Sequence, residues 1–112
     1  MSCMCGIIGY RGNKDACTAI TSGLKTLEYR GYDSWGIAVQ TEGAIHYRKE
    51  VGKISGYEPD MPKSKVGIGH TRWATHGSVT QENSHPHMSC DGRVAIVHNG
   101  IIENHLALKE EL

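Results

Sequence analysis

The order of short β-like runs around one amphipathic stretch is the feature that most limits how this chain can fold. In the β-like runs, apolar residues alternate with small or polar ones, which is typical of strands. After the first run, apolar residues recur at helical spacing from Ala16 to Leu27, which predicts a helix over residues 14–29. The strands mostly follow one another directly, so we expect an α+β fold with antiparallel sheets. The expected strands are residues 5–10, 35–40, 44–49, 66–72 and 93–98.

Local signals indicate where these elements begin and end. Asn13 is the expected N-cap of the helix, and Asp15 would then place negative charge in its first turn. Gly31 is well placed to end the helix. The second and third strands are joined across Thr41-Glu42-Gly43, which suggests a hairpin. Residues 51–65 are expected to form a loop, and residues 73–92 form a long polar segment. A last helix is expected from Glu103 onward.

Composition excludes several classes of function. Twelve basic and twelve acidic side chains cancel, so no nucleic acid or anionic membrane is expected as a partner. The hydrophobic content of 38% is ordinary for a globular domain. No apolar run approaches the roughly 20 residues needed to span a bilayer, and the first residues lack the apolar stretch of a signal peptide. We therefore expect a cytoplasmic protein of one domain, and nothing in the sequence calls for a cofactor.

The chain has four cysteines, at irregular spacings and without a secretory signal, so a disulfide framework is not expected. Cys5 is the one whose setting suggests chemistry. A lone cysteine before a strand is most often a buried thiol. The alternative is an N-terminal nucleophile whose own α-amino group is the base, since that group titrates near ~8 and a thiol near ~8.5. Gly6 would let a substrate approach closely.

Polar residues gather where the strand 66–72 ends, in the run Gly69 to Gly77. An isolated arginine such as Arg72 is usually just solvated. Here it is flanked by Thr71, Thr75 and His76, and a guanidinium can hold a carboxylate through two parallel hydrogen bonds. This run is therefore a candidate site for an amino-acid substrate.

Asn99-Gly100 follows the strand 93–98 and allows two interpretations. Asn-Gly is the commonest two-residue hairpin turn, but residues 101–104 do not look like a returning strand. The alternative is an oxyanion hole made by the Asn99 side-chain amide and the backbone N–H of Gly100. A further hypothesis is a zinc site formed by His85, His87 and Cys90, although a fourth ligand at regular spacing is missing.

Taken together and in this order, these segments resemble the class II glutamine amidotransferases, which are N-terminal-nucleophile hydrolases. The chain is most similar to the branch that makes glucosamine 6-phosphate, and the run Arg-Trp-Ala-Thr-His-Gly is highly specific for it. The resemblance implies a four-layer α-β-β-α sandwich of antiparallel sheets. The segments that match are residues 5–10, 27–34, 67–77, 85–87 and 97–104.

The resemblance also implies a role for each matching residue. Cys5 would attack the side-chain carboxamide of glutamine, forming a thioester and releasing ammonia. Asn99 and Gly100 would hold the oxyanion. Water would then release glutamate. In the full-length enzymes, which are expected to be homodimers, ammonia passes to a separate isomerase domain that converts fructose 6-phosphate to glucosamine 6-phosphate.

The remaining matching residues would bind and order the substrate. Arg72 would bind the α-carboxylate of glutamine, and Thr75 and His76 would line the same pocket. Arg30 and Trp73 would help to order the site and connect it to the sugar-phosphate side.

The sequence departs from the family pattern in three places. Residues 1–4 precede Cys5, so catalysis requires that the mature protein begins at Cys5, and we expect Met4 to be the true start. The sequence ends within an expected helix, before the acidic residue that binds the glutamine amine in the family. We therefore expect residues 5–112 to be the N-terminal portion of the domain, with weak or no activity alone. Trp35 stands where many relatives have Ala.

Other functions stay open on the sequence alone. One is an amidotransferase with a different acceptor. Another is a non-catalytic or regulatory module that retains a glutamine pocket. A third is a small metal protein using His85, His87 and Cys90.

Overall fold

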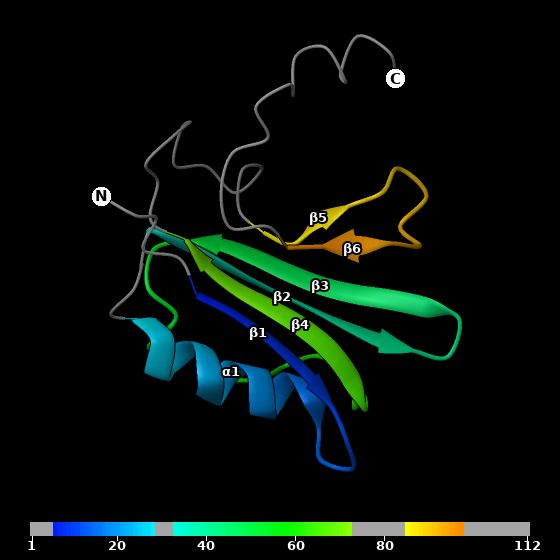
Figure 1. Cartoon of the computed structure of the whole chain (residues 1–112), viewed down its shortest axis with the longest axis horizontal. Coiled ribbons are helices and arrows are strands. Elements are labelled where there is room, and N and C mark those ends of the chain that lie inside the picture. The colour runs from blue at the N-terminus through cyan, green and yellow to red at the C-terminus, as the bar shows by residue number, and fades with distance from the viewer. Residues whose placement is uncertain (1–5, 29–32, 73–84, 98–112) are drawn as a thin grey trace, which may run out of the picture.

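A computed structural model describes residues 6–28, 33–72 and 85–97 of the chain. Within these ranges a four-stranded sheet, in the order β1-β4-β2-β3, is covered on one face by α1 (Figure 1). Every strand pair in it is antiparallel, which confirms the expected α+β class. The two-stranded ribbon β5-β6 lies on the opposite side of the sheet from α1 (Figure 1). The strands are β1 (Gly6–Arg11), β2 (Ser34–Thr41), β3 (Ala44–Val51), β4 (Val66–Arg72), β5 (His87–Met88) and β6 (Ala95–Ile96), and the helix is α1 (Ala16–Leu27).

The helix begins later than its sequence pattern predicts. Asn13 is not its N-cap: Asp15 is, and its Oδ2 accepts hydrogen bonds from the amide of Thr18 at 3.1 Å and the hydroxyl of Thr18 at 2.8 Å. The expected acidic first turn is therefore wrong, because Asp15 lies outside the helix. The amide of Ala16 donates instead to the carbonyl of Ser64 at 2.7 Å. This long-range contact fixes where the helix starts, and no local pattern reports it.

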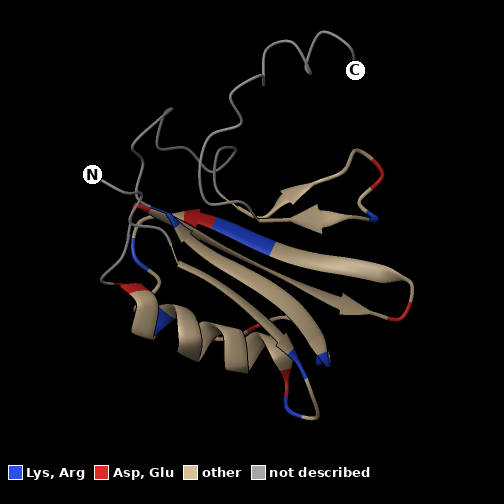
Figure 2. Cartoon of the chain, in the orientation of Figure 1, with Lys and Arg blue, Asp and Glu red and all other residues tan. Residues whose placement is uncertain are grey.

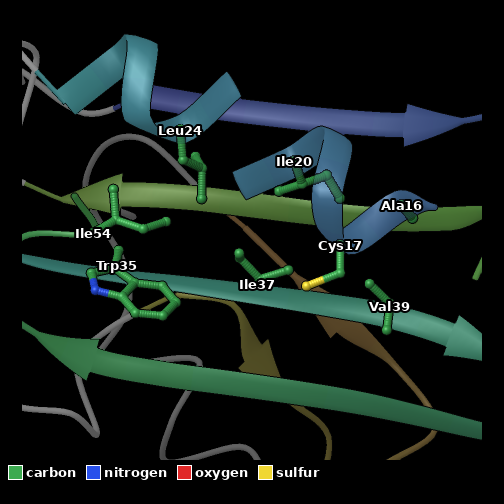
Figure 3. Close-up of a cluster of buried hydrophobic side chains, with 8 residues drawn as sticks. All are labelled: Ala16, Cys17, Ile20, Leu24, Trp35, Ile37, Val39 and Ile54. Carbon is green, nitrogen blue, oxygen red and sulfur yellow. The ribbon is translucent and has the colours of Figure 1, made fainter. Parts of the chain in front are cut away.

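The core lies between α1 and the sheet (Figure 3). On β4, glycines let the helix approach the strand: a Cβ on Gly67 would lie 2.7 Å from Ile20 Cδ1, and one on Gly69 would overlap Ile20. Trp35 is 4% exposed and packs on the ring of Tyr57 with centroids 4.7 Å apart, which explains why a large side chain fits there. The buried cluster consists of Ala16, Cys17, Ile20, Leu24, Trp35, Ile37, Val39 and Ile54.

The segment 52–65 contains no helix or strand, as expected, but it is not simply solvated. Ile54 is 1% exposed, and Tyr57 and Met61 pack against the core cluster. Tyr57 also donates a hydrogen bond to Asp60, whose carboxylate forms an ion pair with Arg48 of β3 at 2.7 Å. Apolar anchors and this polar pair therefore hold the segment against the core and β3.

The hairpin between β2 and β3 is confirmed, with Thr41 opposite Ala44 and Gly43 at φ 75° in its turn. The expected strand 93–98 is wrong at its start, because only Ala95–Ile96 pairs, with β5. The amides of Arg93 and Val94 bond instead to the hydroxyl of Ser89, at 3.2 and 3.0 Å, so they do not join a ladder. The strand β5 was missed because it is two residues long and shows no periodicity.

Candidate functional site

Arg72 is the last residue of β4, at the end of the sheet where β2 begins. It lies opposite Ser34, and its carbonyl accepts a hydrogen bond from the amide of Asp33 at 3.0 Å. Because side chains alternate along a strand, Arg72 lies on the same face as His70, while the buried Thr71 faces α1. The arginine is half-buried, and its backbone is held by the adjoining residues Asp33 and Ser34.

The first strand begins at this same end of the sheet. Gly6 pairs with Thr71, one residue before Arg72. A Cβ on Gly6 would lie 3.0 Å from both Leu27 Cβ and Thr71 Oγ1, so a larger residue would force these elements apart. Cys5 is joined directly to Gly6 but lies outside the described residues.

Cross-strand pairing sets two parallel rows of residues on the sheet face opposite α1. One row runs from Lys49 through Gly36 to His70, and the next contains Ser34 and Arg72. Cross-strand partners are about 5 Å apart at Cβ, so the side chains within a row are neighbours. The sequence did not single out Gly36, His70 or Lys49. The register brings Gly36 and Lys49 to this part of the sheet, whereas His70 is two residues before Arg72 on the same strand.

The segment 85–87 lies directly on the first of these rows. The ring of His85 stacks on that of His70, with centroids 4.2 Å apart and planes at 25°. The ring of His87 follows, with its centroid 4.3 Å from that of His85. His70 is completely buried, and Pro86 is also buried. A row of imidazole rings therefore rises from the sheet beside Arg72.

Positive charge gathers in this region. Figure 2 shows basic residues on β3 and at the end of β4, and Lys49 and Arg72 both act on His87. The side chain of His87 reaches the surface, yet partial loss of water around its ring lowers its pKa, and the charges of Lys49 and Arg72 lower it further. Lys49 and Arg72 thus place positive charge near His87, and such a setting favours an anionic ligand, such as a carboxylate, over a cation.

The second ribbon strand brings another segment to the same place. Ile96 of β6 pairs with His87 of β5, so the chain leaves the described region close to the imidazole row. Asn99 and Gly100 follow three and four residues later in the sequence, outside the described residues. Of the candidate site residues, Arg72 is described, and those outside the described ranges are Cys5, Arg30, Trp73, Thr75, His76, Asn99 and Gly100.

The metal hypothesis has no support in the part of the chain that the structure describes. Within residues 6–28, 33–72 and 85–97, no three His, Cys, Asp or Glu side chains are placed to hold a metal ion. His85 and His87 approach each other through their rings, and Cys90 is exposed. The described cysteines, Cys17 and Cys90, are both free thiols. Over the same ranges, no helix is long and apolar enough to cross a membrane.

A separate surface cavity of about 990 Å³ lies at the other end of the sheet. It is lined by the start of α1, by the β2–β3 turn and by residues 63–65. Lys14, Lys63 and Lys65 border it together with Asp15 and Glu42, so its charge is mixed. The register places this cavity at the opposite end from Arg72, so we do not assign it to the same site.

No protein-family model matches the chain. A glutamine–fructose-6-phosphate aminotransferase [isomerizing] from Corynebacterium efficiens is 51% identical over 120 residues, which cover 97% of this chain and 19% of that protein. One from Thermus thermophilus is 52% identical over 113 residues, again 97% of this chain and 19% of the relative. The chain thus spans about a fifth of the length of these curated relatives.

Solved structures with a similar fold include an enzyme of purine biosynthesis. A glutamine phosphoribosylpyrophosphate amidotransferase from B. subtilis, complexed with ADP and GMP, superposes with a TM-score of 0.77 at 29% identity, covering 94% of this chain and 24% of the other. A structure titled as an allosteric regulatory enzyme of purine biosynthesis gives a TM-score of 0.79 at 28% identity, with the same coverage. These matches confirm the expected N-terminal-nucleophile hydrolase fold. The chain therefore belongs to the glutamine–fructose-6-phosphate aminotransferase family and corresponds to the N-terminal region of its members.

Proposed function

We propose that this chain is the glutamine-hydrolysing part of an aminotransferase that supplies ammonia for the synthesis of glucosamine 6-phosphate. The observation that carries the proposal is the meeting of β1 and β4 at one end of the sheet. There, Gly6 pairs with Thr71 beside Arg72, so the residue joined to Cys5 and the proposed carboxylate ligand share one sheet end. The similarity to aminotransferases over 97% of the chain supports the same function.

In the proposed reaction, the sulfur of Cys5 attacks the side-chain carbonyl carbon of glutamine. The α-amino group of Cys5 accepts the thiol proton, and the two groups suit each other because their ordinary pKa values are close. The side-chain amide of Asn99 and the N–H of Gly100 stabilise the negative charge on the carbonyl oxygen. The C–N bond then breaks, and the proton held by the amine goes to the leaving nitrogen as ammonia forms. Water hydrolyses the remaining thioester and releases glutamate.

Substrate binding in this proposal depends on Arg72. Its guanidinium holds the α-carboxylate of glutamine through paired hydrogen bonds. Thr75 and His76 line the pocket, while Arg30 and Trp73 order it on the side of the sugar phosphate. Pairing with Ser34 of β2 and the hydrogen bond from the Asp33 amide hold the backbone of Arg72, which suits a residue that must orient a substrate.

The activity of the whole protein follows from the same family assignment. An isomerase region beyond this chain would use the ammonia to convert fructose 6-phosphate to glucosamine 6-phosphate, in a cytoplasmic homodimer that needs no cofactor or metal. Residues 1–4 would be absent from the mature protein, with Met4 as the translation start and its removal exposing the amine of Cys5.

The test is glutamate release from glutamine by protein expressed from the complete gene. Cys5→Ala should abolish release, because it removes the sulfur proposed to form the thioester. Cys90→Ala is the matched control, since the thiol of Cys90 is free and exposed, and it should retain full activity. Equal glutamate release by the Cys5→Ala variant and the unsubstituted protein would overturn the proposal.

A further inference from the structure

Gly36 is in contact with the segment that crosses the open face of the sheet. A Cβ at this position would overlap the carbonyl oxygen of His85 and would lie 2.8 Å from Cδ of Pro86. Both of these are parts of the backbone or of a rigid ring, so neither can turn aside as a flexible side chain would. The segment 85–87 can therefore lie at this depth only while position 36 has no side chain.

His70 supports the same segment from the neighbouring strand. It lies directly opposite Gly36 in the β2–β4 pair, and its ring is completely buried beneath the ring of His85. Strand β2 thus leaves room for the backbone of the segment at Gly36, and strand β4 supports the ring of His85 through His70. Offset or stacked aromatic pairs of this kind contribute more than their buried area alone. His87 extends from the pair toward the charges of Lys49 and Arg72.

We propose that Gly36 and His70 are positioning residues, which hold the segment 85–87 against the sheet so that it forms one wall of the carboxylate site at Arg72. The proposal rests on the function proposed above, because its ligand is the α-carboxylate of glutamine. Neither residue touches the substrate. Each acts through the segment 85–87, whose depth on the sheet sets how close the imidazole of His87 lies to the guanidinium of Arg72.

A merely structural role makes a different prediction. If Gly36 and His70 only fill the core, their replacement lowers stability and the amount of folded enzyme, while the KM for glutamine stays the same in the folded fraction. If they set the geometry of the carboxylate site, the KM rises even where the protein is fully folded. A displacement of about 1 Å at a binding group can change a rate constant by up to a hundredfold.

The experiment compares Gly36→Ala with Gly9→Ala in protein expressed from the complete gene. Gly9 is a fair control because it also lies in a strand of this sheet, yet a Cβ there would meet nothing within 4 Å. Glutaminase KM and kcat are measured at a temperature where thermal unfolding shows each variant to be fully folded. We expect the KM for glutamine to rise about tenfold for Gly36→Ala and to stay within about twofold for Gly9→Ala. The same KM for both variants would overturn the proposal.

A second pair of variants keeps the test decisive if Gly36→Ala does not fold. His85→Ala removes the ring that stacks on His70, and His85→Phe replaces it with a ring of similar shape. We expect a raised KM for His85→Ala and recovery of most of the lost affinity in His85→Phe. Equal KM values for His85→Ala and the unsubstituted protein would overturn the inference while leaving the proposed function intact. Failure of the proposed function would appear differently, as no glutamate release by the unsubstituted protein.

Discussion

Gly6 lies directly opposite Thr71 in the ladder between β1 and β4. Sixty-five positions of sequence separate the two residues, yet their pairing brings the beginning of the first strand to the strand end that holds Arg72. Two segments that lie far apart in the sequence, one beginning at Gly6 and one ending at Arg72, thereby meet at one end of the sheet. The proposed glutaminase function depends on this pairing.

Replacing Arg72 with lysine should weaken glutamine binding without unfolding the protein. Lysine keeps the positive charge but loses the paired donors, and a hydrogen bond to a charged group contributes about 1.5–3 kcal/mol. We expect the glutaminase KM of Arg72→Lys to rise about ten- to hundredfold. Arg11→Lys is the control, because Arg11 ends β1 at the opposite end of the sheet, paired with Val66. An unchanged KM for Arg72→Lys would exclude Arg72 as the carboxylate ligand.

Adding a methyl group at Gly69 should destabilise the packing of α1 on the sheet. The new Cβ would overlap Ile20 and lie 3.0 Å from Leu24 Cδ1, both completely buried. Overpacking of this kind costs about 1–3 kcal/mol. Urea unfolding of Gly69→Ala should show this loss, whereas Gly9→Ala, with open space around its Cβ, should unfold like the unsubstituted protein. Equal stability of the two variants would show that the helix can shift to accommodate the methyl group.

Asp15, the N-cap of α1, should stabilise the protein at neutral pH and less so in acid. Burial alone would raise the pKa of Asp15, but hydrogen bonds from the Thr18 hydroxyl and from the amides of Ser64 and Thr18 outweigh it and lower the pKa below 3.8. The pKa of Asp15 is lower in the folded than in the unfolded protein. The ionised carboxylate therefore adds its full share to the folding free energy above pH 3.8, and this share is lost as the pH falls through the folded pKa. We expect Asp15→Ala to cost about 1 kcal/mol at pH 7.

The matched variant Asp15→Asn separates the cap from the charge. Asparagine caps helices about as well as aspartate, so Asp15→Asn should be nearly as stable as the unsubstituted protein at pH 7. Its stability should then fall less between pH 4 and pH 2, since no carboxylate remains to be protonated. Glu42→Gln, in the exposed β2–β3 turn, is the control for removing one negative charge. Identical acid profiles for Asp15→Asn and the unsubstituted protein would contradict this account.

The hydroxyl of Tyr57 should contribute measurably to the stability of the folded protein. Burial raises its pKa, as does its hydrogen bond to Asp60, so the folded state keeps the hydroxyl protonated in mild alkali. The pKa of Tyr57 is higher in the folded than in the unfolded protein. The protonated hydroxyl therefore adds its full share to the folding free energy below pH 10, and this share is lost as the pH rises toward the folded pKa. Tyr57→Phe should cost about 1 kcal/mol in urea unfolding at pH 7. Tyr47→Phe should cost nothing measurable, because Tyr47 is 54% exposed.

The elements that the sequence predicted well are those with local causes. Strand β4 and the β2–β3 hairpin follow from alternation and from a glycine at a turn, and both are confirmed. The predicted helix cap was wrong because a distant contact helps to decide where the helix starts, whereas the start of the last strand was wrong because a short-range turn occupies its amides. The carbonyl of Ser64 accepts the amide of Ala16, and the hydroxyl of Ser89 takes the amides that would begin the strand.

Some residues of the candidate site could likewise be predicted from the sequence and others could not. Arg72 could be identified because it lies in a distinctive run of polar residues, and the described structure places it at a strand end. Gly36 could not, since an isolated glycine in a strand is an ordinary residue, and His70 lies in the same polar run as Arg72 but was given no role of its own. Only the register of β2 against β4, together with the stacking of His85, shows what they do.

The most direct test of the central claim is the N-terminal residue of the active enzyme. Protein expressed from the complete gene would be analysed by intact mass and by N-terminal sequencing, and the same sample would be assayed for glutamate release. The account predicts that active protein begins at Cys5, with residues 1–4 absent. Rapid glutamate release by protein that begins at Met1 or Ser2 would contradict it, because Cys5 would then have an amide nitrogen that cannot act as the base.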